Sequence, residues 1–341
     1  MSHAAVRVLS SLGVLGLAAC GGDQPVPASM ADSTTTPVPA VAALPSNVAT
    51  RILTEIGDST SRIEGLALHA GLLYVADWKD GAIYRVDPAN PTPVKVGALP
   101  TAPNEPIFAL LTDAAGNLFA ATPMSGTVHR IAAARLGAAN FDPSRDVTPF
   151  ATGAKGANGL VFDANGHLFI SGGDAGTLYH VGPTGGVAAV FATGYATPSA
   201  DTTMPVRAYV VNGGAVDSKG FVYTANTGTG AITRLEVKPD YTVGAITTLV
   251  SDARLIGADG LALGTADTLW VSANYLNTLA KVAPDGTVTI MALDATAGGA
   301  LRFPAEFKVA GTSIYVANLN YPLGSNAGSG PGASIAAVEV N

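Results

Sequence analysis

Two acids and two amides, each followed by glycine, recur along the chain and have the chemistry of a binding site for a hard cation. They are Glu64, Asn158, Asn212 and Asp259. Carboxylate and amide oxygens are typical ligands of Ca²⁺. The two carboxylates balance a 2+ charge, and the absence of His and Cys from the set disfavours Zn²⁺. The four residues therefore predict one calcium-type site, provided that the fold brings them together.

A repeat that begins near residue 50 supplies such a fold. Each copy has an apolar strand, a turn, a second strand with an aromatic residue and a third strand, as in NGLVFDANGHLFISG followed by GTLYHV. The second-strand aromatics lie about 45 to 54 residues apart, a period typical of propellers. They are Tyr74, Phe119, Phe169, Tyr223, Trp270 and Tyr315. We predict an all-β fold, a six-bladed β-propeller.

The end of the chain predicts how the ring closes. Fourth strands such as PVKVGAL and TVTIMAL follow the earlier third strands, but the chain ends at Asn341 after the sixth third strand. The segment 49–56, ATRILTEI, is unassigned at the front. We expect it to complete the last blade, so that no sheet edge stays open within a propeller domain of residues 48–341.

The first residue of each inner strand should lie at one height beside the propeller axis. Alignment on the aromatics places there Glu64, Phe108, Asn158, Asn212, Asp259 and Glu306. The sixth placement requires a hairpin two residues shorter than the others. An alternative is that Asn158-Gly159 and similar pairs are turn dipeptides, although this does not explain their matching phase or Glu64.

These motifs resemble those of the SMP-30/gluconolactonase/LRE-like propellers, with diisopropylfluorophosphatase and paraoxonase as more distant relatives. The order Glu, Asn, Asn, Asp over blades one, three, four and five carries the resemblance. It implies Ca²⁺-dependent hydrolysis of a lactone or related ester, with Asp259 as metal ligand and catalytic residue. Glu306 is a second candidate base. Phe108 and Glu306 depart from the family pattern and argue against a sugar lactone.

Loops on the same face as the ring residues provide candidates for substrate contacts. Trp78 and Tyr275, with Phe108, are expected to form an apolar wall. The longest link, Gly194 to Val211, could form a lid in which Arg207 meets an anionic group. The alternatives are that the side chains on these loops only cap strand ends, and that the long link is an ordinary surface loop.

The N-terminus predicts export and membrane anchoring. Arg7, an apolar run and Leu17-Ala18-Ala19-Cys20 resemble a lipoprotein signal over residues 1–20, with lipidation at Cys20. An ordinary signal peptide is the alternative. Residues 21–47, rich in Pro, Ala, Thr and Ser, indicate a flexible tether. We expect a monomer in the cell envelope, held by its lipid at the outer membrane or periplasmic face if the source is Gram-negative.

Composition limits the partners. The net charge is −7 without a Lys/Arg cluster, which excludes a typical nucleic-acid-binding surface. Cys20 is the only cysteine, so no internal disulfide can form. A non-catalytic envelope protein that binds a ligand or partner protein through the propeller face is the main alternative. Lyase or condensing chemistry is a third alternative. The number of blades and the set of two acids and two amides disfavour it.

Overall fold

The computed structural model describes residues 45, 48–102, 105–137, 141–294, 298–328 and 332–340. Cys20, the signal and most of the tether lie outside the described residues. The described chain forms six antiparallel sheets, which we call blades 1 to 6. Blade 1 contains β2 (Ile63–His69), β3 (Leu72–Asp77), β4 (Ala82–Asp87) and β5 (Asn90–Ala98). Blade 2 contains β6 (Ala109–Thr112), β7 (Leu118–Thr122), β8 (Thr127–Ile131) and β9 (Val147–Thr152).

The other blades repeat this order. Blade 3 has β10 (Leu160–Phe162), β11 (Leu168–Ser171), β12 (Thr177–Val181) and β14 (Ala189–Thr193). Blade 4 has β15 (Gly214–Val216), β16 (Val222–Asn226), β17 (Ala231–Val237) and β18 (Val243–Ser251). Blade 5 has β19 (Ala258–Leu263), β20 (Leu269–Ala273), β21 (Thr278–Val282) and β22 (Val288–Leu293). Blade 6 has β23 (Pro304–Ala310), β24 (Ser313–Asn318), β25 (Ala333–Val340) and β1 (Val48–Ile56).

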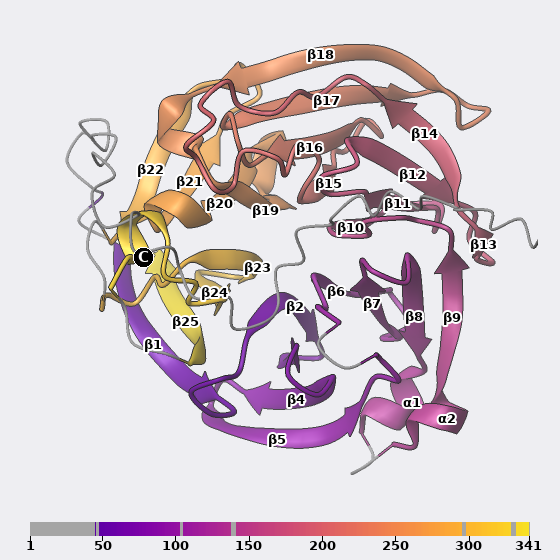
Figure 1. Cartoon of the computed structure of the whole chain (residues 1–341), viewed down its shortest axis with the longest axis vertical. Coiled ribbons are helices and arrows are strands. Elements are labelled where there is room, and N and C mark those ends of the chain that lie inside the picture. Colours follow the sequence, from indigo (N-terminus) through magenta and orange to yellow (C-terminus); the bar gives the residue numbers. More distant parts are fainter. Residues whose placement is uncertain are drawn as a thin grey trace, which may run out of the picture. The chain divides into compact units, whose positions relative to one another are not determined.

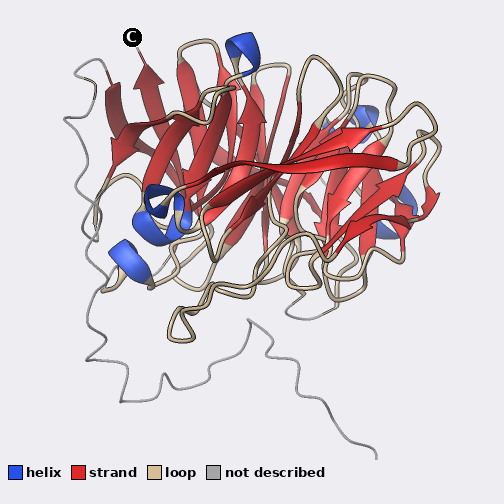
Figure 2. Ribbon diagram, turned by 90° about the horizontal axis from the view of Figure 1, so that it is seen from above, coloured by secondary structure: helices blue, strands red, loops and turns tan. Residues whose placement is uncertain are grey.

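The blades form a closed ring. The first strand of each blade contacts the first strand of the next, from β2 through β6, β10, β15 and β19 to β23, and β23 returns to β2 (Figure 1). The strands run between two faces at which most loops gather (Figure 2). We call the face where the first strands begin the site face, and the opposite one the hairpin face. The prediction of a six-bladed propeller is confirmed.

The N-terminal strand closes the ring as predicted. β1 pairs antiparallel with β25, with Thr50 opposite Val338 and Ile56 opposite Ala333. In Figure 1 the indigo β1 runs beside the yellow β25. Leu53 and Ile56 are buried with apolar residues of blades 1 and 6. Burial of these side chains against both ends of the ring joins the first and last blades.

The repeated aromatics pack between neighbouring blades. Tyr74, for example, is buried with Leu110 and Leu118 of blade 2. Basic side chains on the third strands stand opposite these aromatics, so that Arg85 pairs in register with Tyr74 and Arg130 with Phe119. Lys281 lies over the Trp270 ring at 4.4 Å. In blade 5 a buried ring is thus covered by a basic side chain.

Short elements interrupt the repeat. Helices α1 (Ala133–Leu136) and α2 (Pro143–Asp146) lie between β8 and β9, and β13 (Gly186–Val187) pairs parallel with β9 of blade 2. Single 3₁₀ turns are η2 (Ala253–Leu255), η3 (Thr265–Asp267), η4 (Asn274–Leu276) and η5 (Gly324–Asn326). Within the described ranges, each helix is too short to cross a membrane.

Candidate functional site

A β-bulge opens the first strand of several blades and carries the ring residue. In blade 1, Ile63 pairs with Asp77 and Leu66 with Val75, so Glu64 and Gly65 together oppose Ala76. In blade 5, Asp259 and Gly260 likewise oppose Ser272. A bulge places two residues against one and redirects their side chains, and it is common beside functional sites. The acid-glycine pairs are therefore bulges, not turns.

Blades 3 and 4, whose ring residues are asparagines, share the same local hydrogen bonds. The N–H of Asn158 donates to the carbonyl of Ser171, and the N–H of Ser171 donates back to Gly159. Asn212 and Gly213 make the same two bonds with Ala225. Phe108 begins blade 2 in this way, because its N–H donates to Ala121. The sequence alignment thus gave the correct register for five blades.

In blades 1, 3, 4 and 5 the ring residue is followed by a glycine, which the close approach of the next blade requires. A Cβ on Gly213 would lie 2.0 Å from the carbonyl oxygen of Asp259. A Cβ on Gly159 would lie 2.6 Å from that of Asn212, and one on Gly260 would lie 2.8 Å from that of Ala305. Glycine in a strand often marks such a backbone approach. The Asn-Gly and Asp-Gly pairs therefore bring successive ring residues together around the axis.

Blade 6 departs from the expected placement. Pro304 pairs with Asn318 and Phe307 with Val316, so Ala305 takes the ring position and Glu306 the position that glycine holds elsewhere. The placement of Glu306 at the ring position was wrong by one residue. The physical reason is the hairpin between Ala310 and Ser313, which is a two-residue turn like that between His69 and Leu72. Both hairpins are one residue shorter than those of the other blades, whereas the sequence alignment had assumed that the hairpin of blade 6 is two residues shorter.

The surroundings of Asp259 raise the pKa of its carboxyl. Burial raises the pKa of its carboxyl to about 7, Glu306 adds to the increase through charge repulsion, and hydrogen bonds from Asn274 and Asn212 oppose it. The Asn274 amide Nδ2 donates to Asp259 Oδ2 at 2.9 Å. A buried carboxylic acid with a pKa near neutrality is typical of functional sites.

Two amide oxygens beside this acid have no hydrogen-bond donor within the described part of the chain. They are Oδ1 of Asn212 and Oδ1 of Asn274, and both are buried. The Nδ2 of Asn212 donates to Thr227 Oγ1, which in turn donates to the carbonyl of Ala258, so the amide is held with its oxygen unpaired. Buried polar atoms are rarely left without a partner. A cation would satisfy such an oxygen.

The donor set defines what kind of cation fits. Glu64, Asn158, Asn212 and Asp259 are all buried at the start of their strands. Among the described residues, no three His, Cys, Asp or Glu side chains gather closely enough to hold a metal ion. A cation at this site would therefore depend on amide oxygens and water beside the carboxylates. That coordination suits Ca²⁺ and not Zn²⁺.

Glu306 has a cationic neighbour that sequence reasoning missed. Lys308 Nζ lies 3.1 Å from Glu306 Oε1, and the N–H of Phe307 donates to the same oxygen. Both side chains are mostly buried. The ammonium group compensates the charge of Glu306. Residues at i and i+2 on one strand lie on the same face, and this was the signal in the sequence.

Two of the expected wall residues touch each other. The Trp78 and Phe108 rings are 5.3 Å apart in an edge-to-face arrangement, and Trp78 Nε1 donates to the carbonyl of Ile107. Both side chains are only partly buried. Tyr275 and Trp78 both pack against a buried apolar cluster on the site face.

The link from Gly194 to Val211 forms the centre of that cluster. Its Met204 and Val206 are buried against Phe303, Leu319 and the ring residue Ala305 of blade 6. Asn226 at the end of β16 anchors the link by donating to the carbonyl of Thr197. The link therefore extends from blades 3 and 4 to the site-face ends of blades 5, 6 and 1.

Arg207 lies within this link and forms hydrogen bonds to another residue of the link. Its Nε and Nη2 donate to the carbonyl of Ser199 at 3.0 and 2.9 Å. Both bonds stabilise the fold of the link itself, and a contact between Arg207 and an anionic group stays a prediction.

Comparisons with known proteins agree on the fold. No protein-family model and no curated protein matches the sequence. Among solved structures, a luciferin-regenerating enzyme is 12% identical, with a TM-score of 0.63, over 86% of this chain and 95% of its own. A gluconolactonase from Xanthomonas campestris is 14% identical, with a TM-score of 0.59, over 87% and 91% of the two chains.

A third neighbour has different chemistry. The virginiamycin B lyase from Staphylococcus aureus is 12% identical, with a TM-score of 0.57, over 86% of this chain and 100% of its own. At such identities the likeness shows the propeller fold alone. The choice among hydrolysis, elimination and binding therefore depends on the residues of the axial site.

Proposed function

We propose that this chain is a Ca²⁺-dependent hydrolase that opens a lactone or related ester at the axial site, as a member of the SMP-30/gluconolactonase/LRE-like propellers. The observation that carries the proposal is the unpaired Oδ1 of Asn212 beside the buried carboxyl of Asp259. Gluconolactonases among the structural neighbours support hydrolysis as the general class of reaction.

Glu64, Asn158, Asn212 and Asp259 would hold the cation. When bound, Ca²⁺ supplies Lewis-acid stabilisation of the negative charge that develops on the carbonyl oxygen. The amide of Asn274 fixes the orientation of Asp259 through its hydrogen bond to Oδ2. Such supporting hydrogen bonds determine how well a ligand carboxylate is positioned.

Asp259 is also the residue that we assign to proton transfer. Its carboxylate accepts a proton from water as the water oxygen bonds to the ester carbonyl carbon. The ring C–O bond then breaks, and the alkoxide takes up the proton, which gives a hydroxy acid.

The apolar neighbours argue for a substrate that is not a sugar. Trp78 and Phe108 form one wall, and Met204 of the 194–211 link covers the same face. Apolar side chains exclude water and strengthen electrostatic interactions at the reacting carbonyl. We therefore expect an ester whose ring carries an apolar substituent.

The test is a panel of aliphatic lactones, sugar lactones, aryl esters and phosphotriesters, hydrolysed by residues 45–341 with Ca²⁺ and with EDTA. This segment contains every blade and each apolar cluster of the described chain. Lactone opening that needs Ca²⁺ supports the proposal. Ca²⁺ binding without turnover would instead support a non-catalytic ligand-binding protein, and metal-independent cleavage would contradict the proposal.

A further inference from the structure

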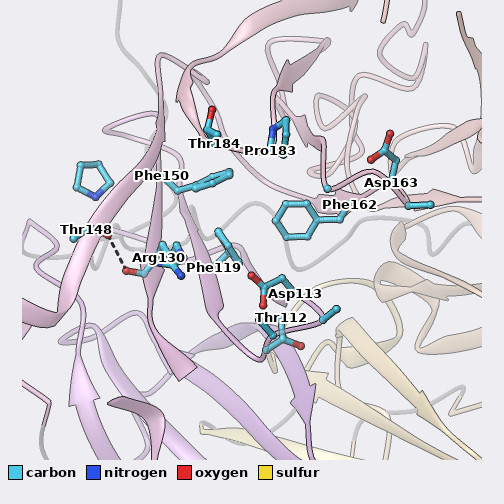
Figure 3. Close-up of a pocket in the computed structure, with 15 residues that line it drawn as sticks. Thr112, Asp113, Phe119, Arg130, Thr148, Phe150, Phe162, Asp163, Pro183 and Thr184 are labelled. Carbon is cyan, nitrogen blue, oxygen red and sulfur yellow. Dashed lines mark hydrogen bonds between the residues drawn. The ribbon is translucent and has the colours of Figure 1, made fainter. Parts of the chain in front are cut away.

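A second cavity lies away from the axis, between blades 2 and 3 on the hairpin face. Its volume is about 700 Å³, and its lining includes the hairpin residues Asp113 and Asp163 (Figure 3). None of the ring residues contributes to it. A cavity of this size is within the range that accommodates a small organic ligand.

Three aromatic rings from both blades form the floor of this cavity. Phe119 lies 4.9 Å from Phe150 and 5.0 Å from Phe162, in edge-to-face arrangements. Phe150 and Phe162 project from opposite blades toward the same space (Figure 3). Both are only partly buried, so their rings remain accessible to a ligand. This floor favours an aromatic or otherwise flat apolar body.

Arg130 is the cationic side chain of the lining. Its guanidinium forms no hydrogen bond or ion pair with any side chain in the described part of the chain. The equivalent Arg234 of blade 4 lies over the Phe221 ring at 4.8 Å, and Lys281 of blade 5 lies over Trp270. Arg130 lacks such a ring contact within the described ranges.

The two acids of the lining are already engaged. Asp113 accepts hydrogen bonds from the N–H and the Nδ2 of Asn117. Asp163 accepts from the N–H groups of Asn165 and His167 and from the Tyr241 hydroxyl. These bonds hold the hairpins and reduce the capacity of the carboxylates to bind a ligand cation. The guanidinium remains the group that can form new charge-assisted hydrogen bonds.

We propose that this cavity is a second binding site for an aromatic carboxylate, with its carboxylate on Arg130 and its ring on the Phe119–Phe150–Phe162 floor. The site is on the opposite face from the axial residues, so it is independent of the proposed hydrolase activity.

The test is titration of residues 45–341 with 2-naphthoate, 2-naphthalenemethanol and 2-naphthylmethylamine, followed by calorimetry. We expect the anion to bind most tightly. Arg130→Gln should weaken naphthoate binding by about tenfold and leave the alcohol unchanged. Arg85→Gln, at the equivalent half-buried position of blade 1, should have no effect on naphthoate.

Phe162→Ala should weaken binding of the anion and of the alcohol alike, because it removes part of the floor. The proposal is overturned if naphthoate does not bind, if the amine binds more tightly than the anion, or if Arg130→Gln and Arg85→Gln bind naphthoate equally. Circular dichroism of each variant confirms that the propeller is intact before the comparison is made.

Discussion

Asn274 Nδ2 donates a hydrogen bond of 2.9 Å to Asp259 Oδ2 across the end of blade 5, while its side-chain Oδ1 is buried and has no donor among the described residues. The side chain therefore does more than cap a strand. It stabilises one carboxylate oxygen of Asp259 and directs an unpaired oxygen within the same buried region. This relationship links the positioning of the acid to the binding of a cation.

Replacement of Asn274 should affect the site more than the fold. We expect Asn274→Ala to lower Ca²⁺ affinity by about tenfold, because the ligand carboxylate loses the bond that orients it. Asn318 ends β24 one position before the place that corresponds to Asn274, and its amide holds the carbonyl of Ala300 and Ser334 Oγ. Asn318→Ala should therefore destabilise the fold and leave Ca²⁺ affinity unchanged. Calorimetric titration of both variants makes the comparison, and equal losses of affinity would contradict it.

The raised pKa of Asp259 predicts how stability depends on pH without a cation. Its contribution is fully present below the ordinary value of 3.8 and is lost as the pH rises through about 7, because burial disfavours the ionised form. In EDTA, the melting temperature should therefore decrease over this range more in the wild type than in Asp259→Asn.

Ca²⁺ should reverse this dependence. A proton competes with the cation for Asp259, so Ca²⁺ affinity should decrease about tenfold per pH unit below the pKa. The increase in melting temperature caused by Ca²⁺ should be larger at pH 8 than at pH 5. An increase that is the same at both pH values would show that Asp259 is not a ligand.

The close approach between blades 4 and 5 can be tested at Gly213. A Cβ there would lie 2.0 Å from a backbone oxygen, so Gly213→Ala should lower the free energy of unfolding by about 3 kcal/mol. Gly182→Ala is the control, since its Cβ would meet nothing within 4 Å. Urea unfolding of both variants measures the difference. A Gly213→Ala protein as stable as the control would contradict the packing that we describe.

The sequence repeat made the fold predictable. The details that could not be predicted concern strand register and contacts between residues that are distant in the sequence. The period of the aromatics determined six blades, and the unassigned segment 49–56 determined the closure by β1. The register at Glu306 was misread because it depends on the length of the hairpin between Ala310 and Ser313, and an error of one residue in that length moves the ring position by one residue. Only the strand pairing identifies Ala305 as the ring residue.

Contacts between residues far apart in the chain were beyond the sequence for the same reason. The bond between Asn274 and Asp259 joins residues 15 positions apart. The packing of Met204 against blade 6 depends on the path of a long link, which has no periodicity to reveal it.

The most direct test of the account is kcat/KM for lactone opening by the wild type and by Asp259→Ala, each with Ca²⁺ and with EDTA. Asp285→Ala, which removes an exposed acid from a hairpin of blade 5, is the control. We predict activity in the wild type and the control with Ca²⁺, and a loss of at least about a hundredfold in EDTA or in Asp259→Ala. Lactone opening by Asp259→Ala at the wild-type rate would contradict the assignment of the axial site.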